Sequence, residues 1–209
     1  RFWIKVFTAT FALGVATGIT MEFSFGTNWA DYARFVGDIF GAPLAAEALL
    51  AFFLESVFLG VLLFGRKKVG KKFYLASAWL VWFGSCLSAL WIIIANSWMQ
   101  TPAGAELSAD GTQAILTDFI AAAFNATTIP RYLHTVDALL IMGAFMALAI
   151  GAWYLKKGRH TEFALRTVRV ASCVALVTTV LMVAFAHQSA VVVAEEQPTK
   201  FAMMEGAYE

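Results

Sequence analysis

Two acidic residues, Glu47 and Glu55, lie in an apolar stretch that runs from Ala42 to Phe64. The stretch is long enough to cross a bilayer, which takes about 20 residues. A charged side chain near the bilayer centre costs about 2.5–3.5 kcal/mol, so two carboxyls there call for a cation, a metal centre, water or a proton as partner. Eight helical residues separate them by about 12 Å along the axis and about 80° around it, so both can face one interior. The pattern predicts an ion or proton route; the alternative is a neutral, hydrogen-bonded pair with no further task.

Two polar side chains in the next apolar stretch, Ser88 and Asn96, are also eight residues apart. The same helical spacing lets them line one interior. Taken singly, each is more commonly a helix-packing hydrogen bond than part of a conduit.

A histidine, His134, lies near the start of another apolar stretch, with Asp137 three residues further on. Imidazole is a good ligand for haem iron. The residue types therefore indicate a haem site, and the alternative is an interfacial histidine hydrogen-bonded to Asp137 or to water.

The composition requires these residues to be positioned by membrane helices. Of the 209 residues, 60% are hydrophobic, and the mean hydropathy of +0.72 lies far above that of a soluble domain. We expect an all-α polytopic transmembrane helix bundle, forming a single domain over 1–209. The expected spans are Phe7–Thr20, Ala42–Phe64, Phe73–Trp98, Tyr132–Leu155 and Val168–His187.

The connecting segments carry three further expectations. Pro43 is predicted in the first turn of the second span, where its missing N–H costs nothing. Gln113–Phe124 is predicted as a short amphipathic helix on the surface. The tail from Gln188 is polar, and it is predicted to lie outside the membrane.

The basic residues give the orientation. With five spans, 12 of the 15 lysines and arginines fall on one side, at the N-terminus and in the turns after the second and fourth spans. Only Arg34, Arg131 and Lys200 lie on the other side. The positive-inside rule makes the first side cytoplasmic.

Several long runs resemble subunit I of the cytochrome bd-type quinol oxidases. They are FALGVATGITMEFSFGTNW (Phe11–Trp29), VGDIFGAPLAAEALLAFFLES (Val36–Ser56), GSCLSALWIIIANSWMQTPAG (Gly84–Gly104), the pair His134–Thr135 and QPTKFAMMEGAYE (Gln197–Glu209). Members of that family have a further span before the matching region and several more after it. The resemblance therefore implies a piece of a longer chain that lacks the first span and the C-terminal half.

The resemblance also implies roles for particular residues. His134 matches an axial ligand of the low-spin haem b. Glu47 and Glu55 match acids beside the high-spin haem b and haem d, where they supply protons or bind a haem. The other matches are Lys200 and Glu205 with quinol-binding residues at the start of an external loop (189–209), and Ser88 and Asn96 with polar positions on a proton route.

The implied activity is that of a quinol oxidase in the cytoplasmic (inner) membrane of a bacterium or archaeon. Ubiquinol or menaquinol is oxidised at the outer face, and O2 is reduced to water with cytoplasmic protons, which generates a proton motive force without a pump. The implied partners are subunit II, a small single-helix subunit and the lipid bilayer, with no nucleic acid.

Two other functions remain open from the residues alone. A proton-coupled secondary transporter could use Glu47 and Glu55, although the chain has no inverted repeat of broken helices. A haem-binding electron carrier without oxygen chemistry is the third interpretation.

Overall fold

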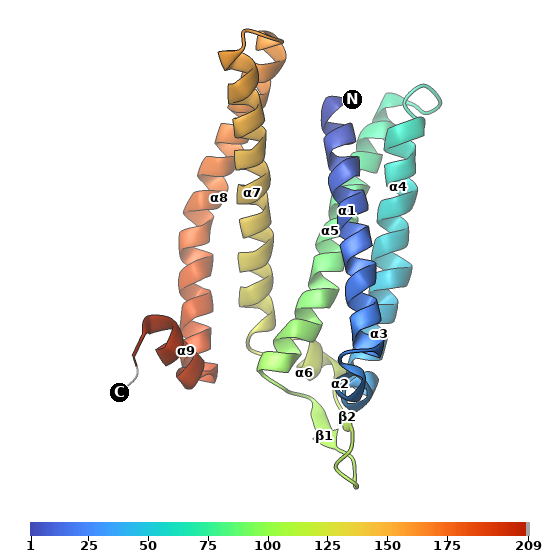
Figure 1. Ribbon diagram of the computed structural model, residues 1–209, viewed down its shortest axis with the longest axis vertical. Coiled ribbons are helices and arrows are strands. Elements are labelled where there is room, and N and C mark those ends of the chain that lie inside the picture. The colour runs from blue at the N-terminus through green and yellow to red at the C-terminus, as the bar shows by residue number, and fades with distance from the viewer. Residues whose placement is uncertain (208–209) are drawn as a thin grey trace. The chain divides into compact units, whose positions relative to one another are not determined.

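The computed structural model describes residues 1–207, with every side chain among them except that of Leu50. The chain forms two compact units, Arg1–Ala123 and Phe124–Glu209. Figure 1 shows that both are built almost entirely of long helices.

The first unit is a group of membrane-length helices with short helices at one end. Its helices are α1 (Phe2–Gly26), α2 (Ala30–Phe35), α3 (Gly37–Ala46), the π-helical turn η1 (Glu47–Phe52), α4 (Phe53–Phe64) and α5 (Lys71–Gln100). A short basic turn joins α4 to α5, and these two helices pack against each other along their length. Leu59, Leu62 and Val81 form their buried contact, against which Ile4 and Phe11 of α1 also pack.

A small cap closes the end of this unit that lies away from the basic turn. It contains the antiparallel hairpin β1 (Ala105–Leu107) and β2 (Ala114–Leu116), followed by α6 (Phe119–Ala123). Its core holds Phe40 and Trp98, whose rings meet edge to face with centroids 5.6 Å apart. The Asp38 carboxylate accepts a 2.8 Å hydrogen bond from the backbone N–H of Leu116, which ties α3 to the hairpin.

The second unit is a helical hairpin of α7 (Thr128–Lys156) and α8 (Thr161–Glu196), followed by the short helix α9 (Pro198–Glu205). Small residues permit the close packing of α7 and α8, as is usual between membrane helices. A Cβ added at Gly151 would lie 2.7 Å from Val168 Cγ2. Ala164, Ala171 and Ala175 of α8 are buried.

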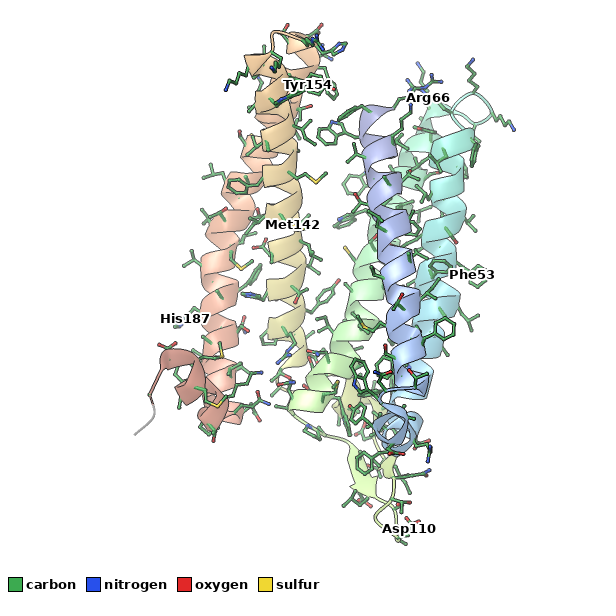
Figure 2. All side chains as sticks on the ribbon, in the orientation of Figure 1. Phe53, Arg66, Asp110, Met142, Tyr154 and His187 are labelled. Carbon is green, nitrogen blue, oxygen red and sulfur yellow. The ribbon has the colours of Figure 1, made fainter. Side chains whose placement is uncertain are left out.

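The predicted all-α transmembrane fold is confirmed, since five helical stretches within residues 1–207 are long and apolar enough to cross a membrane. Within the first unit, the N-terminus of α1 and the α4–α5 turn lie at one end and the hairpin at the other (Figure 1). Figure 2 labels Arg66 and Asp110 at these two ends, which we call the basic end and the hairpin end. This arrangement agrees with the predicted grouping of the bases at the N-terminus and in the α4–α5 turn, and the assignment of that end to the cytoplasm remains a prediction.

The expected bounds were too short, because hydropathy marks the lipid-facing core of a helix and not its ends. Helix α1 begins at Phe2, and α8 continues to Glu196 through the segment expected to be a polar tail. Pro43 does not lie in a first turn: α3 begins at Gly37, so the proline is inside that helix.

The expected surface helix at Gln113–Phe124 is wrong for its first half, which contains strand β2. The side chain of Asp110 organises the preceding turn by accepting hydrogen bonds from Ser108 Oγ at 2.6 Å and Thr112 Oγ1 at 2.8 Å. Asp118 then begins α6, since its Oδ1 accepts from the backbone N–H groups of Ile120 and Ala121. These local turn interactions override the weak helical periodicity of the segment.

Candidate functional site

The two acids of the second membrane helix both face α5. The Ser85 hydroxyl donates a hydrogen bond to Glu55 Oε1, and the Ser88 hydroxyl donates to Glu47 Oε1 at 2.8 Å. The expectation that both carboxyls face one interior is therefore confirmed. Ser85 and Ser88 are three residues apart, which puts them on one face of α5.

Glu47 begins the π-helical turn η1, four residues after Pro43. A proline has no N–H for the carbonyl four residues earlier, so the regular ladder of the helix is already interrupted here. π-helical turns are rare, and they occur frequently at functional sites. The widened turn changes the angular relation of Glu47 to Glu55 from that of an uninterrupted α-helix.

Glu55 lies deepest in this contact, because Gly84 lets α5 approach it closely. The Glu55 side chain is only 7% exposed, whereas Glu47 is partly exposed. A Cβ added at Gly84 would lie 2.7 Å from Glu55 Cγ and 3.4 Å from Glu55 N. Glycine is therefore required for this separation of the two helices.

Each carboxyl has one oxygen that no hydrogen bond reaches within residues 1–207. In both Glu47 and Glu55 the serine hydroxyl binds Oε1, and Oε2 has no such contact. A carboxyl held at one oxygen keeps a fixed direction while the other oxygen can gain or lose a proton. The pairs thus form two oriented carboxyl groups about two helical turns apart along the second membrane helix.

Of the two predicted polar residues of α5, Ser88 is hydrogen-bonded to Glu47. Asn96 is exposed on the surface of this chain, and its role on a proton route remains a prediction. Ser85 was missed. Its i, i+3 spacing from Ser88 could have indicated it, because that spacing puts both hydroxyls on the helix face that meets the two acids.

His134 lies in the first turns of α7 in the second unit and is partly buried. Its Nδ1 is buried without a hydrogen-bond partner in the described part of the chain, and so is Oδ2 of Asp137, a residue that is 4% exposed. Within the described chain His134 Nδ1 therefore does not bind Asp137, and the alternative of an interfacial histidine hydrogen-bonded to Asp137 or to water stays open.

These features fit an axial haem ligand. Haem iron can take a single imidazole nitrogen as its protein ligand on one side. A ligating histidine usually donates its second N–H to a neighbouring acceptor. The buried Nδ1 and the nearby Asp137 carboxyl offer such a pair of groups.

Lys200 and Glu205 both lie on α9, which packs against α8. Lys200 is partly buried, and Glu205 is exposed. Five helical residues turn about 140°, so the two side chains leave α9 in different directions. Their role in binding quinol remains a prediction.

Fold and site together define a helical membrane protein with two serine-bonded acids between two of its helices and a histidine whose surroundings fit a haem ligand. The family model described as cytochrome bd terminal oxidase subunit I matches residues 1–209, and the chain belongs to this family. The family implies haem cofactors.

Individual relatives agree with this assignment. The chain is 49% identical over 209 residues to cytochrome bd-II ubiquinol oxidase subunit 1 of Escherichia coli (strain K12), covering 100% of this chain and 41% of the relative. It is 41% identical over 209 residues to cytochrome bd ubiquinol oxidase subunit 1 of Bacillus subtilis (strain 168), covering 100% of this chain and 44% of the relative. The solved bd oxidase from Geobacillus thermodenitrificans matches with a TM-score of 0.93 at 30% identity, covering 100% of this chain and 48% of that one. The chain thus spans less than half the length of these relatives.

Proposed function

We propose that this chain is a membrane-spanning part of subunit I of a haem-containing quinol oxidase. The complete protein oxidises quinol at the outer face, reduces O2 to water with cytoplasmic protons and so generates a proton motive force. Family membership over residues 1–209 supports the reaction class. The observation that carries the proton-handling part is the pair of carboxyl–serine contacts between the second membrane helix and α5.

The order of the two acids gives the proton route a direction. Glu55 lies in α4, nearer the basic end, and Glu47 lies in η1, nearer the hairpin end. A proton that arrives from the basic end meets Glu55 first and Glu47 second. Each ionised acid can take the proton up at Oε2 from a direction that its serine has fixed at Oε1, with Ser88 and Asn96 as polar groups of the route.

His134 is the proposed axial ligand of a low-spin haem b, and Glu47 is a proposed contact of the other haems, a high-spin haem b and haem d. When bound, haem supplies the electron transfer and the oxygen chemistry. The chain supplies an imidazole nitrogen, an apolar helix surface and the oriented acids.

The proposed quinol site is at α9. A lysine ammonium such as Lys200 can donate hydrogen bonds to a quinol oxygen, and a carboxylate such as Glu205 can accept the proton that the quinol loses. Both bacterial relatives described above are named as ubiquinol oxidase subunits. Ubiquinol or menaquinol is the proposed substrate here.

The proposed setting is a bacterial cytoplasmic membrane, with subunit II and a small single-helix subunit as partners. Five membrane-length helices and bacterial relatives support the location. The family match does not favour the alternative of a proton-coupled transporter.

The test is to measure quinol-dependent oxygen consumption in the full-length oxidase carrying Glu47→Gln or Glu55→Gln. A proton-transferring side chain contributes about 10²–10⁴-fold to rate, so each variant is expected to lose most of its turnover, and Glu55→Gln is expected to do so with the haem spectrum retained. Glu106→Gln, at an exposed position of β1, is the control. Normal turnover with normal haem content in both variants would refute the proposal.

A further inference from the structure

The hydroxyl of Ser85 has two acceptors within reach, and they belong to different helices. One is Glu55 Oε1 across the α4–α5 contact, and the other is the carbonyl oxygen of Val81, 3.2 Å away in α5 itself. A serine hydroxyl carries a single proton and can rotate freely, so it makes one strong donated bond at a time. Bonding to the carbonyl four residues earlier is a normal resting position for a helical serine.

A second serine of α5 shows which acceptor a helical serine binds when its hydroxyl makes no hydrogen bond to a carboxyl group. Ser77, about two turns before Ser85, is fully buried, and its hydroxyl donates to the carbonyl of Phe73 at 2.8 Å. Ser85 has the same kind of acceptor available and nevertheless donates to Glu55. The difference is the carboxyl that Gly84 allows to approach.

The charge on Glu55 determines which of the two acceptors the Ser85 hydroxyl binds. A hydrogen bond to an ionised carboxylate is roughly twice as strong as one to a neutral acceptor. Once the carboxyl is protonated, that advantage disappears, and the carbonyl of Val81 becomes the competitive acceptor.

We propose that Ser85 is a positioning residue whose hydroxyl turns between Glu55 and Val81 as Glu55 loses and gains its proton. In the ionised state the Ser85 O–H binds Oε1 and directs Oε2 toward the incoming proton. Proton uptake forms an O–H bond at Oε2, and the Ser85 O–H, which is never broken, turns to the carbonyl oxygen of Val81. Loss of the proton reverses both events. This inference rests on the proposed role of Glu55 in proton transfer.

The test is oxidised-minus-reduced infrared spectroscopy of the full-length oxidase, in which bands that disappear in Glu55→Gln are assigned to Glu55. Ser85→Ala is expected to shift the carboxylate stretch of Glu55 and to leave the C=O stretch of its protonated form in place. Ser85→Thr keeps a hydroxyl and is expected to restore the original carboxylate band. Ser77→Ala is the matched control, and it is expected to move neither band.

Four results would overturn the inference. An unshifted carboxylate band in Ser85→Ala would mean that the hydroxyl does not hold Glu55. A shift of the protonated C=O band would mean that the hydroxyl stays on Glu55 after proton uptake. Absence of any Glu55-dependent band, combined with lost oxygen consumption in Glu55→Gln, would remove the switching step and leave the proposed function standing. Full oxygen consumption in Glu55→Gln would instead remove the premise.

Discussion

Replacing Gly84 with alanine is expected to push α4 and α5 apart at the carboxyl–serine contact. The added Cβ would lie 2.7 Å from Glu55 Cγ. Carbon atoms in favourable contact lie about 3.5–4.0 Å apart, so the helices must separate by about 0.8 Å or more. Cγ is close to the backbone of Glu55, and rotation of the carboxyl end does not relieve the clash.

The change in the free energy of unfolding is the difference between a destabilising and a stabilising contribution. Overpacking by one methyl group costs about 1–3 kcal/mol. Alanine in place of a glycine inside a helix stabilises the helix by about 1 kcal/mol. The expected net loss in the free energy of unfolding is therefore about 0–2 kcal/mol. Locally, the distance between Ser85 and Glu55 is expected to increase.

Gly60 provides the matched control in α4, because a Cβ added there meets nothing within 4 Å in the described chain. The measurement is thermal inactivation of the full-length oxidase, followed by loss of the haem Soret band, together with oxygen consumption before heating. Gly84→Ala is expected to inactivate at a lower temperature than Gly60→Ala and to turn over more slowly. Equal stability and equal turnover in the two variants would refute the argument from helix separation.

Three further predictions concern other parts of the chain. His134→Ala is expected to erase the reduced-minus-oxidised absorbance band of the low-spin haem, and survival of that band would end the assignment. Lys200→Ala and Glu205→Ala are each expected to raise the apparent KM for quinol with haem spectra intact; unchanged turnover at low quinol would locate that site elsewhere. Hydrogen bonds from the Ser108 and Thr112 side chains and from the Thr112 backbone N–H lower the pKa of Asp110 from 3.8 to about 2. Their contribution to hairpin stability is therefore fully present above pH 3.8 and is lost as the pH falls through about 2, which ¹³C NMR titration of carboxyl-labelled aspartates can follow. A pKa near 3.8 would contradict this.

The sequence was sufficient to predict the membrane helices and the shared direction of the two acids. Apolar stretches of bilayer length are a strong signal, and an eight-residue spacing restricts the directions of Glu47 and Glu55 on any helix. It was not sufficient to predict η1. A π-helical turn depends on how the surrounding helices pack, and Pro43 alone indicates only that the ladder is interrupted nearby.

The serines illustrate the same limit at the site. Which hydroxyl meets which carboxyl depends on the vertical offset of α4 against α5, and that offset is set by Gly84 and by the apolar contact around Leu59 and Val81. Pattern alone paired Ser88 with Asn96, whereas the structure pairs Ser88 with Glu47 and adds Ser85. Hydrogen bonds between side chains of different helices are a tertiary property.

The turn η1 ties the length of the second membrane helix to the docking of the cap. Each residue of an α-helix advances the rotation about the helix axis by about 100°. Deleting one residue between Glu47 and Phe52 would therefore rotate the preceding part of the helix by roughly that angle about its axis. Asp38 would then leave the backbone N–H of Leu116 that it binds here. Insertions and deletions should consequently be tolerated in the α4–α5 turn and at the hairpin tip far better than in these six residues.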